Sequence, residues 1–295
     1  EQGDTSAQHN LGWMFDNRNG DLQDKKTAIK WYTLAAEQGN VSAQFILGNM
    51  YSQEGVLQDF KTAIKWYTLA AEQGNVSAQN NLGVMYSQEE VVGGKPDYKN
   101  AVKWFRRAAD QEDADAQFNL GQMYRRGDGV SQDFKTALKL FRLAANQELD
   151  SAQNSLGVMY SKGEGVLPDY KIAVKWYELA AEQENSGAQH NLGWLFGNGG
   201  YGLQKDKKIA AKWFKRAAAQ GNASAQYNLG LLYENGYGVL QDNIYAHMWG
   251  NISALNQYME GLKLRDRVEK KMTVSDISVA QKLARECEKK EYKGC

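Results

Sequence analysis

The chain has few of the residues that interrupt helices or provide reactive side chains. Its 295 residues include 2 prolines, 2 cysteines and 3 histidines. The scarcity of proline favours helix, because proline removes a backbone donor and disrupts a helix interior. With 42% apolar residues and 11% aromatics, the composition is typical of a folded protein that is strongly biased towards helix.

Excess charge of one sign and long apolar runs are also missing. The 35 basic and 35 acidic residues cancel, which argues against nucleic-acid binding, because that function needs a basic surface. No uninterrupted apolar run is long enough to predict a membrane-spanning helix. The chain begins at Glu1 without an initiator methionine, and its first residues read like the end of a repeat. We therefore expect that an upstream segment, including a signal peptide, has been removed.

One motif recurs along most of the chain. The string Ala-Gln-x-x-Leu-Gly starts at Ala7, Ala43, Ala78, Ala116, Ala152, Ala188 and Ala225. Successive copies lie 35 to 38 residues apart, and the length changes fall in one loop, near Glu54-Gly55, at residues 93–96 and near Gly199-Gly200. Length changes confined to one loop are typical of stacked helix pairs, so the period predicts about seven two-helix units.

Each unit contains the pattern of two amphipathic helices. The first helix of the first unit carries an apolar stripe formed by Ala7, Leu11, Met14 and Phe15. The motif glycine beside this stripe, Gly12 in the first unit, predicts close approach of the partner helix. The second helices are expected to begin after aspartate N-caps, such as Asp59, Asp133 and Asp169. Their tryptophans should be packing residues: Trp31, Trp66, Trp104, Trp176 and Trp213.

The residues that follow each second helix indicate how the turn to the next repeat closes. Gly39, Gly74 and Gly221 are placed to close the helix in a left-handed C-cap. Glutamate occupies this place in three middle units, at Glu112, Glu148 and Glu184. Because a side chain disfavours the left-handed conformation, we expect those three turns to close differently.

These motifs resemble the Sel-one-like repeat (SLR) family, relatives of the tetratricopeptide repeats. The resemblance covers about residues 1–255 and includes Gly-x-Gly-Val, as in Gly127-Asp128-Gly129-Val130, and Ala-x-Lys-Trp-Tyr-x-x-Ala-Ala-x-Gln-Gly. It implies an all-α, right-handed α–α superhelical solenoid of about seven repeats, the first truncated at its N-terminal side. It also implies an adaptor or scaffold, since many family members act in this way and many are bacterial and exported.

The last part of the chain departs from the repeat. Residues 256–295 lack another copy of the motif, and a charged amphipathic helix is predicted over Leu255 to Lys271. Thr273 with Asp276 predicts a capping box for a last helix. Because a solenoid needs an atypical terminal unit with a polar outer face, we interpret residues 256–295 as capping helices.

The two cysteines, Cys287 and Cys295, are either free thiols or a disulfide. A metal site is not expected, because two thiolates without nearby histidines do not complete a tetrahedral centre. The resemblance favours the disulfide, since the spacing resembles the Cys-x7-Cys pairs of cysteine-rich SLR proteins. A disulfide implies an oxidising compartment, so we expect a periplasmic or secreted protein rather than a cytoplasmic one.

Sequence patterns for catalysis are weak. The run Gly197-Asn198-Gly199-Gly200-Tyr201-Gly202 fits G-x-G-x-x-G, but a dinucleotide site requires a strand before it and a helix after it. This run follows a predicted helix, so we expect no cofactor. Some cysteine-rich SLR relatives are associated with β-lactam binding or hydrolysis, but no serine nucleophile or metal-ligand cluster supports that activity here. We expect that the protein is not an enzyme.

The least repetitive positions of the units share one face of the first helices, opposite the apolar stripe. In the related tetratricopeptide repeats the matching positions contact peptide ligands. We therefore predict partner contacts at His9, Trp13, Phe45, Asn49, Asn80, Phe118, Gln122, Arg125, Asn154, His190, Trp194 and Tyr227. The alternative is that some of the aromatics pack against a neighbouring repeat. A recurring asparagine borders this face, at Asn10, Asn81, Asn119, Asn191 and Asn228. It could bind a peptide backbone or link adjacent helices.

The sequence thus favours a monomeric interaction scaffold that binds a protein or peptide in the concave groove of the solenoid. We expect an exported bacterial regulator that neither binds nucleic acid nor inserts into a membrane. Two alternatives are an immunity protein or inhibitor that neutralises a toxin or enzyme, and a weak hydrolase of cell-wall or β-lactam substrates.

Overall fold

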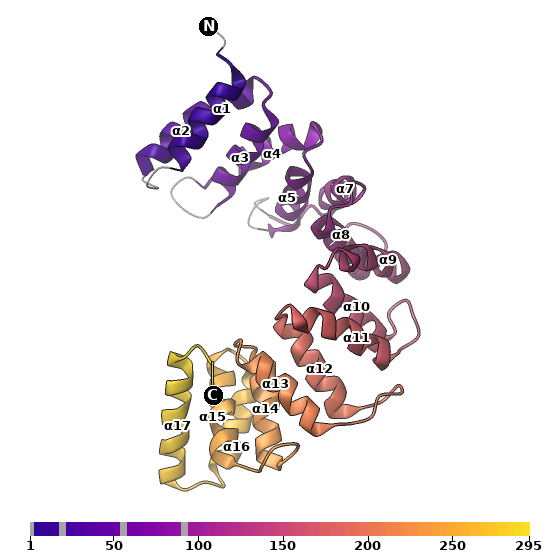
Figure 1. Ribbon diagram of the computed structural model, residues 1–295, viewed down its shortest axis with the longest axis vertical. Coiled ribbons are helices and arrows are strands. Elements are labelled where there is room, and N and C mark those ends of the chain that lie inside the picture. The colour runs from indigo at the N-terminus through magenta and orange to yellow at the C-terminus, as the bar shows by residue number, and fades with distance from the viewer. Residues whose placement is uncertain (1–2, 18–21, 54–57, 90–93) are drawn as a thin grey trace. The chain divides into compact units, whose positions relative to one another are not determined.

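The computed structural model describes residues 3–17, 22–53, 58–89 and 94–295. The predicted features at Glu1, Gln2, Glu54, Gly55 and Gly93 lie outside these residues. Sixteen helices form in the described residues, and they follow one another as antiparallel pairs (Figure 1). The β-structure of the described residues consists of one isolated antiparallel β-bridge between Gly200 and Leu203. The fold is therefore the all-α repeat array that the periodicity predicts.

The helices belong to two compact units, Glu1–Ala144 and Ala145–Cys295. The first unit contains α1 (Thr5–Asp16), α2 (Leu22–Glu37), α3 (Val41–Ser52), α4 (Phe60–Glu72), α5 (Val76–Ser87), α7 (Tyr98–Ala109), α8 (Ala114–Arg126) and most of α9 (Phe134–Asn146). The second contains α10 (Asp150–Lys162), α11 (Tyr170–Glu182), α12 (Ser186–Asn198), α13 (Lys207–Ala218), α14 (Ala223–Asn235), α15 (Asn243–Leu255), α16 (Met259–Glu269) and α17 (Val274–Lys289). The first helices of the repeats are α1, α3, α5, α8, α10, α12 and α14.

Side-chain caps fix where the helices begin. The carboxylate of Asp59 accepts hydrogen bonds from the backbone N–H groups of Lys61 and Thr62 at the start of α4. Asp169 caps α11 in the same way, which confirms the predicted starts of the second helices. The first helices use another cap, as at α5, where the Asn75 side chain accepts from the N–H of Ala78.

The motif glycine makes room for an aromatic ring. A Cβ added to Gly12 would lie 2.7 Å from Cδ1 of Tyr32, and one added to Gly193 would lie 2.6 Å from Cδ1 of Phe214. The predicted close approach is therefore confirmed, and the group that approaches is the ring after the repeat tryptophan. These rings are almost fully buried: Tyr32, Tyr67, Phe105, Phe141, Tyr177 and Phe214. Of the tryptophans, Trp66 and Trp104 are buried and Trp31, Trp176 and Trp213 are half-buried.

The turns after the second helices correct one prediction. Glu112, Glu148 and Glu184 have φ of 66°, 64° and 62°. Gly39, Gly74 and Gly221 occupy the same place with φ of 89°, 92° and 79°. The expectation that the glutamate turns close differently is therefore wrong. In all six turns the left-handed residue lies two positions before the first residue of the next helix, so the connection imposes this conformation whatever the side chain.

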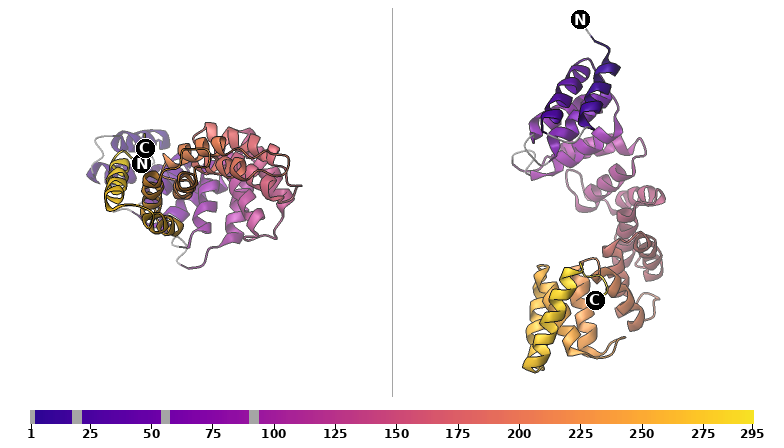
Figure 2. Two further views of the ribbon diagram at one scale, coloured as in Figure 1. Left: turned by 90° about the horizontal axis from the view of Figure 1, so that it is seen from below. Right: turned by 60° about the vertical axis from the view of Figure 1, so that its left-hand side comes forward.

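The C-terminal helices cover the end of the second unit. α16 packs against α15 and α14, and α17 packs against α15, so the yellow helix of Figure 2 lies alongside the preceding repeat. Thr273 and Asp276 form the predicted capping box of α17. The charged helix α16 begins at Met259 rather than at Leu255, because Leu255 ends α15 and Gln257 turns the chain with φ of 65°. A disulfide joins Cys287, which is buried, to Cys295.

Candidate partner-binding face

The predicted contact residues lie on the first helices, and we call the side that carries them the first-helix face. Five of them pack against aromatic rings in a tilted orientation rather than project outwards. His9 contacts Tyr32 with ring centroids 5.6 Å apart, and Phe45 contacts Tyr67 at 6.0 Å. The same arrangement joins Phe118 to Phe141, His190 to Phe214 and Tyr227 to Tyr258. These five residues are half-buried, so they form the floor of the face. Each ring partner belongs to the same repeat as the residue it contacts, rather than to a neighbouring repeat.

The recurring asparagines link neighbouring first helices. Asn119 donates from Nδ2 to Oδ1 of Asn80 at 3.1 Å, and Asn191 donates to Asn154 at 3.1 Å. Nδ2 of Asn228 lies 3.1 Å from Nε2 of His190. The structure therefore uses these amide donors within the array, and the predicted residues Asn80, Asn154 and His190 serve as their partners.

Polar residues elsewhere on the face are also engaged. Asn49 accepts at Oδ1 from the Tyr67 hydroxyl at 2.6 Å. Gln122 is half-buried, and its Oε1 is buried without a hydrogen-bond partner. Arg125 is half-buried, and its backbone carbonyl accepts from Gln132 at 2.9 Å.

Two tryptophans differ from the rest of the predicted set, because they are large, apolar and open to solvent. Trp13 is 56% exposed and Trp194 is 46% exposed. The Trp194 ring meets the edge of Tyr170, with centroids 6.3 Å apart, which fixes it beside the preceding repeat. Large exposed aromatics held in place by neighbours are the residues that dominate binding energy in protein interfaces.

A cleft opens on the first-helix face between consecutive repeats in each unit. In the first unit it has a volume of about 300 Å³ and is lined by Asn49, Ser52, Phe60, Tyr67, Asn81, Val84, Met85 and Gln88. In the second unit the volume is about 270 Å³, and the lining residues are Gly193, Trp194, Gly197, Asn198, Lys207, Phe214, Asn228, Leu231, Leu232, Asn235 and Tyr237. When first helices are aligned on the motif glycines and second helices on their aspartate N-caps, all eight residues of the first cleft have counterparts in the second. The same repeat geometry therefore produces both clefts.

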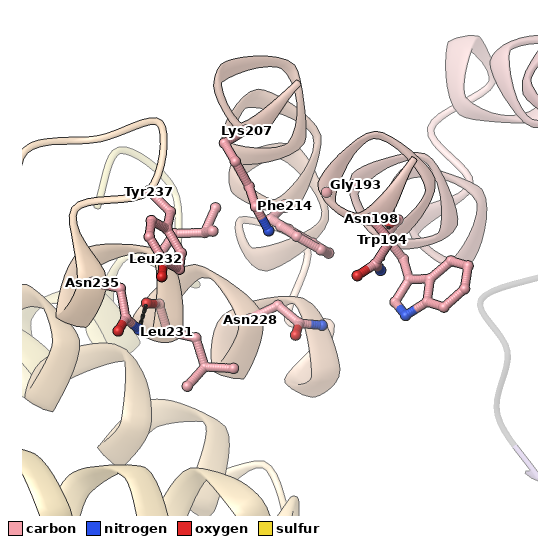
Figure 3. Close-up of a pocket in the computed structure, with 11 residues that line it drawn as sticks. Gly193, Trp194, Asn198, Lys207, Phe214, Asn228, Leu231, Leu232, Asn235 and Tyr237 are labelled. Atoms are coloured by element: carbon pink, nitrogen blue, oxygen red, sulfur yellow. Dashed lines mark hydrogen bonds between the residues drawn. The ribbon is translucent and has the colours of Figure 1, made fainter. Parts of the chain in front are cut away.

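The cleft of the second unit, which we call the Lys207 cleft, differs from the first at seven of the eight matched positions. One difference replaces an aromatic ring with a cation, and another removes a side chain. Lys207 stands where the first cleft has Phe60, and Gly197 stands where it has Ser52. Figure 3 shows the Lys207 side chain pointing into the cleft, between Tyr237 and Asn198. Its Nζ lies 5.4 Å from the Tyr237 ring centroid, a cation–π distance. Burial, together with the charge of Lys205, lowers the pKa of Lys207. Sequence reasoning missed Lys207, although the repeats show an aromatic at its place.

Another position of the face is closed by the C-terminal helices. Glu234 is 6% exposed, and its carboxylate pairs with Arg267 at 2.6 Å and Lys271 at 2.8 Å. The hydrogen bond from Arg267 lowers the pKa of Glu234 most, and that from Lys271 lowers it further. This ion-pair cluster attaches α16 and its following turn to α14.

The glutamine of the motif has a structural role that sequence reasoning did not assign. These residues, the glutamine row, are all buried: Gln8, Gln44, Gln79, Gln117, Gln153, Gln189 and Gln226. Gln44 donates from Nε2 to the carbonyl of Ala36 at 3.0 Å, and its Oε1 accepts from Gln73 at 2.8 Å. It thereby joins the end of α2 to the end of α4. Equivalent bonds occur at Gln79, Gln153, Gln189 and Gln226.

The described residues contain neither a candidate metal site nor a membrane-spanning helix. None of their histidine, cysteine, aspartate and glutamate side chains form a group of three that could hold a metal ion. No helix in residues 3–17, 22–53, 58–89 and 94–295 is long and apolar enough to cross a membrane.

Two-helix repeats with varied residues on one face define a helical repeat protein. The Sel1 repeat model matches residues 5–40, 41–75, 76–113, 114–149, 150–185, 186–222 and 223–258. The chain therefore belongs to the Sel1 repeat family, as its motifs predict.

Solved structures are similar to most of the chain. A Sel1 repeat protein from Oxalobacter formigenes is 34% identical with a TM-score of 0.74, covering 89% of this chain and 76% of that one. A protective antigen present in uropathogenic Escherichia coli strains, which displays an SLR fold, is 30% identical with a TM-score of 0.62, covering 99% and 78%. An immunity protein from Pseudomonas aeruginosa is 18% identical with a TM-score of 0.46, covering 76% and 82%, a likeness too low to support a shared function. No curated protein matches the chain.

Proposed function

We propose that the protein is an interaction scaffold that binds a protein or peptide partner on its first-helix face. The exposure of Trp13 and Trp194 is the observation that carries this proposal, because a purely solvated face would be polar at those positions. Membership of the Sel1 repeat family supports it, since these repeats are typical of protein–protein interaction and are generally non-enzymatic. The packed rings of His9, Phe45 and their counterparts provide a rigid floor beside these tryptophans.

We also propose that the protein acts as an exported bacterial regulator in an oxidising compartment. The disulfide between Cys287 and Cys295 supports export, because disulfides persist in the periplasm and outside the cell but are rare in the cytosol. The solved relatives from Oxalobacter formigenes and Escherichia coli support a bacterial context.

Partner capture with matched variants tests the proposed face. We expect Trp13→Ala and Trp194→Ala to weaken capture of the partner from a periplasmic extract, each by about 2 kcal/mol in binding free energy, with little change in Tm. Leu179→Ala is the control, because Leu179 on the second helix α11 is 45% exposed, nearly the same as Trp194. Equal losses of capture in Leu179→Ala and Trp194→Ala would refute the assignment of this face.

A further inference from the structure

The Lys207 cleft carries a positive charge because the sixth repeat has a lysine where four other repeats have an aromatic residue. The first residue of the second helix is Phe60 in α4, Tyr98 in α7, Phe134 in α9 and Tyr170 in α11. Tyr170 shows what this ring does, since it is 8% exposed and packs on Trp194 and on Tyr201, with a centroid distance of 4.9 Å to the latter. Lys207 puts an ammonium group at the corresponding place in α13 instead.

Gly197 adds to the space around this ammonium group. Serine occupies its position in α3, α5 and α10, as Ser52, Ser87 and Ser161. A Cβ added to Gly197 would lie 3.9 Å from Nζ of Lys207. The missing side chain therefore leaves the cleft open directly beside the charge.

The charge of Lys207 has no carboxylate to pair with. None of the residues that line the cleft is acidic. The neighbouring Asp206 turns its carboxylate to the backbone N–H groups of Lys208 and Ile209, where it caps α13. Within the described residues, no carboxylate oxygen lies in ion-pair distance of Lys207 Nζ. A cation that is partly removed from water favours an anionic ligand.

Two exposed amides beside Lys207 offer acceptor atoms to the same ligand. Asn198 and Asn235 each donate from Nδ2 to a backbone carbonyl, of Trp194 at 2.9 Å and of Leu231 at 2.8 Å. Their Oδ1 atoms accept no hydrogen bond within residues 145–295. One asparagine lies on α12 and the other at the end of α14, so these acceptors stand on both sides of the cleft (Figure 3).

The size of the cleft points to side chains rather than to a whole small molecule. Its volume of about 270 Å³ lies below the range of roughly 300–1,000 Å³ that small-molecule sites occupy. Trp194 and Tyr237, which are 46% and 51% exposed, add aromatic walls at the rim. An apolar side chain next to the anionic group could pack on these walls.

We propose that the Lys207 cleft binds an acidic side chain from an internal, extended segment of a partner protein. The carboxylate pairs with Lys207 Nζ, backbone N–H groups on either side donate to Asn198 and Asn235, and an adjoining apolar side chain packs on Trp194. This inference rests on the proposed function, because it specifies the chemistry of the partner on the first-helix face. Asn49, Ser52 and Phe60 make the corresponding cleft of the first unit neutral, so acidic selectivity belongs to the sixth and seventh repeats.

A display library of short peptides tests the proposal. Each peptide is flanked by fixed sequences, so that neither of its termini is free. We expect the wild-type protein to enrich peptides with an aspartate or glutamate next to an apolar residue. Lys207→Phe, which introduces the residue of the first cleft, should bind them about 3- to 10-fold more weakly. Lys207→Arg should retain most of the affinity, and Gly197→Ser should reduce it by narrowing the cleft. The Tm of Lys207→Phe should equal or exceed that of the wild type, because an aromatic fits this position in four other repeats.

The outcomes separate this inference from the proposed function. Enriched peptides without an acidic position, or equal affinity in wild type and Lys207→Phe, would overturn the inference. If those peptides were still lost in Trp194→Ala, the proposed function would stand. If no peptide bound the wild type better than a Trp13→Ala/Trp194→Ala variant, both would be wrong. Binding that required a free C-terminal carboxylate would also overturn the inference.

Discussion

Replacing Glu148 by glycine should make the protein more stable. Glu148 has a φ of 64° in the turn after α9, the left-handed conformation that Gly39 and Gly74 adopt in equivalent turns. Its side chain is exposed and makes no hydrogen bond or ion pair with the rest of the described chain. The substitution therefore removes backbone strain without removing a side-chain interaction.

The size of the effect follows from two opposing terms. The left-handed conformation costs a residue with a side chain roughly 1–2 kcal/mol and costs glycine almost nothing. The greater freedom of glycine in the unfolded chain offsets about 0.4–1 kcal/mol of this gain. Glu148→Gly should therefore raise the free energy of unfolding by about 0.5–1 kcal/mol, equivalent to about 1–4 °C in Tm for a chain of this size.

Urea denaturation followed by circular dichroism measures this change. The reciprocal variant Gly74→Glu is the control, since an added Cβ there has no atom within 4 Å and the backbone alone is strained. It should lower the free energy of unfolding by about 1 kcal/mol. If Glu148→Gly left the unfolding midpoint unchanged and Gly74→Glu cost nothing, the backbone conformation would not limit the stability of these turns.

Two further predictions concern the packing and the titration of the second unit. Gly193→Ala should lower the free energy of unfolding by about 1–3 kcal/mol, because its Cβ would lie 2.6 Å from Phe214. Gly197→Ala in the same helix should be neutral or stabilising, because the added Cβ would lie 3.7 Å from its nearest neighbour. Equal denaturation midpoints for the Gly193→Ala and Gly197→Ala variants would contradict the close packing of Phe214 on Gly193. Burial lowers the pKa of His190, so the unfolded chain binds a proton more readily and stability should fall as the pH drops below about 6.5. His190→Asn introduces the residue that Asn80 and Asn154 place at this position, and it should reduce the loss of stability when denaturation midpoints are compared across pH. If the variant and the wild type lost stability equally at low pH, His190 would not be the cause of the loss.

The helix pairs could be predicted because their signals are local. An aspartate or asparagine cap, an alanine stripe and a glycine opposite a ring all act within one repeat, as at Asp59 and Gly193. The left-handed glutamates could not be predicted in the same way, because propensity argues against them. The geometry of the turn, in which the left-handed residue lies two positions before the next helix, overrides that propensity at Glu112, Glu148 and Glu184.

The position of the predicted contact residues on the first helices could be read from the sequence, but the exposure of each side chain could not. Phe45 and Trp13 are both aromatics of the first-helix face, yet Phe45 packs against Tyr67 while Trp13 remains 56% exposed. This difference depends on the neighbouring rings, which a periodic pattern does not specify. A signal for the Lys207 cleft was present, since lysine replaces the aromatic that starts four other second helices. An alignment of the second helices of the repeats, in addition to the first helices, identifies Lys207 as a departure from that aromatic.

The glutamine row makes the repeats interchangeable in evolution. Each glutamine with both bonds meets a partner from its own repeat, such as Gln73 for Gln44, and a backbone carbonyl of the repeat before, such as that of Ala36. Because the carbonyl is present whatever the side chain, any repeat can follow any other without leaving a buried amide unpaired. Recombination within the gene can therefore add or delete whole repeats, and each exchange lengthens, shortens or reorders the first-helix face while the interior of the array keeps its hydrogen bonds.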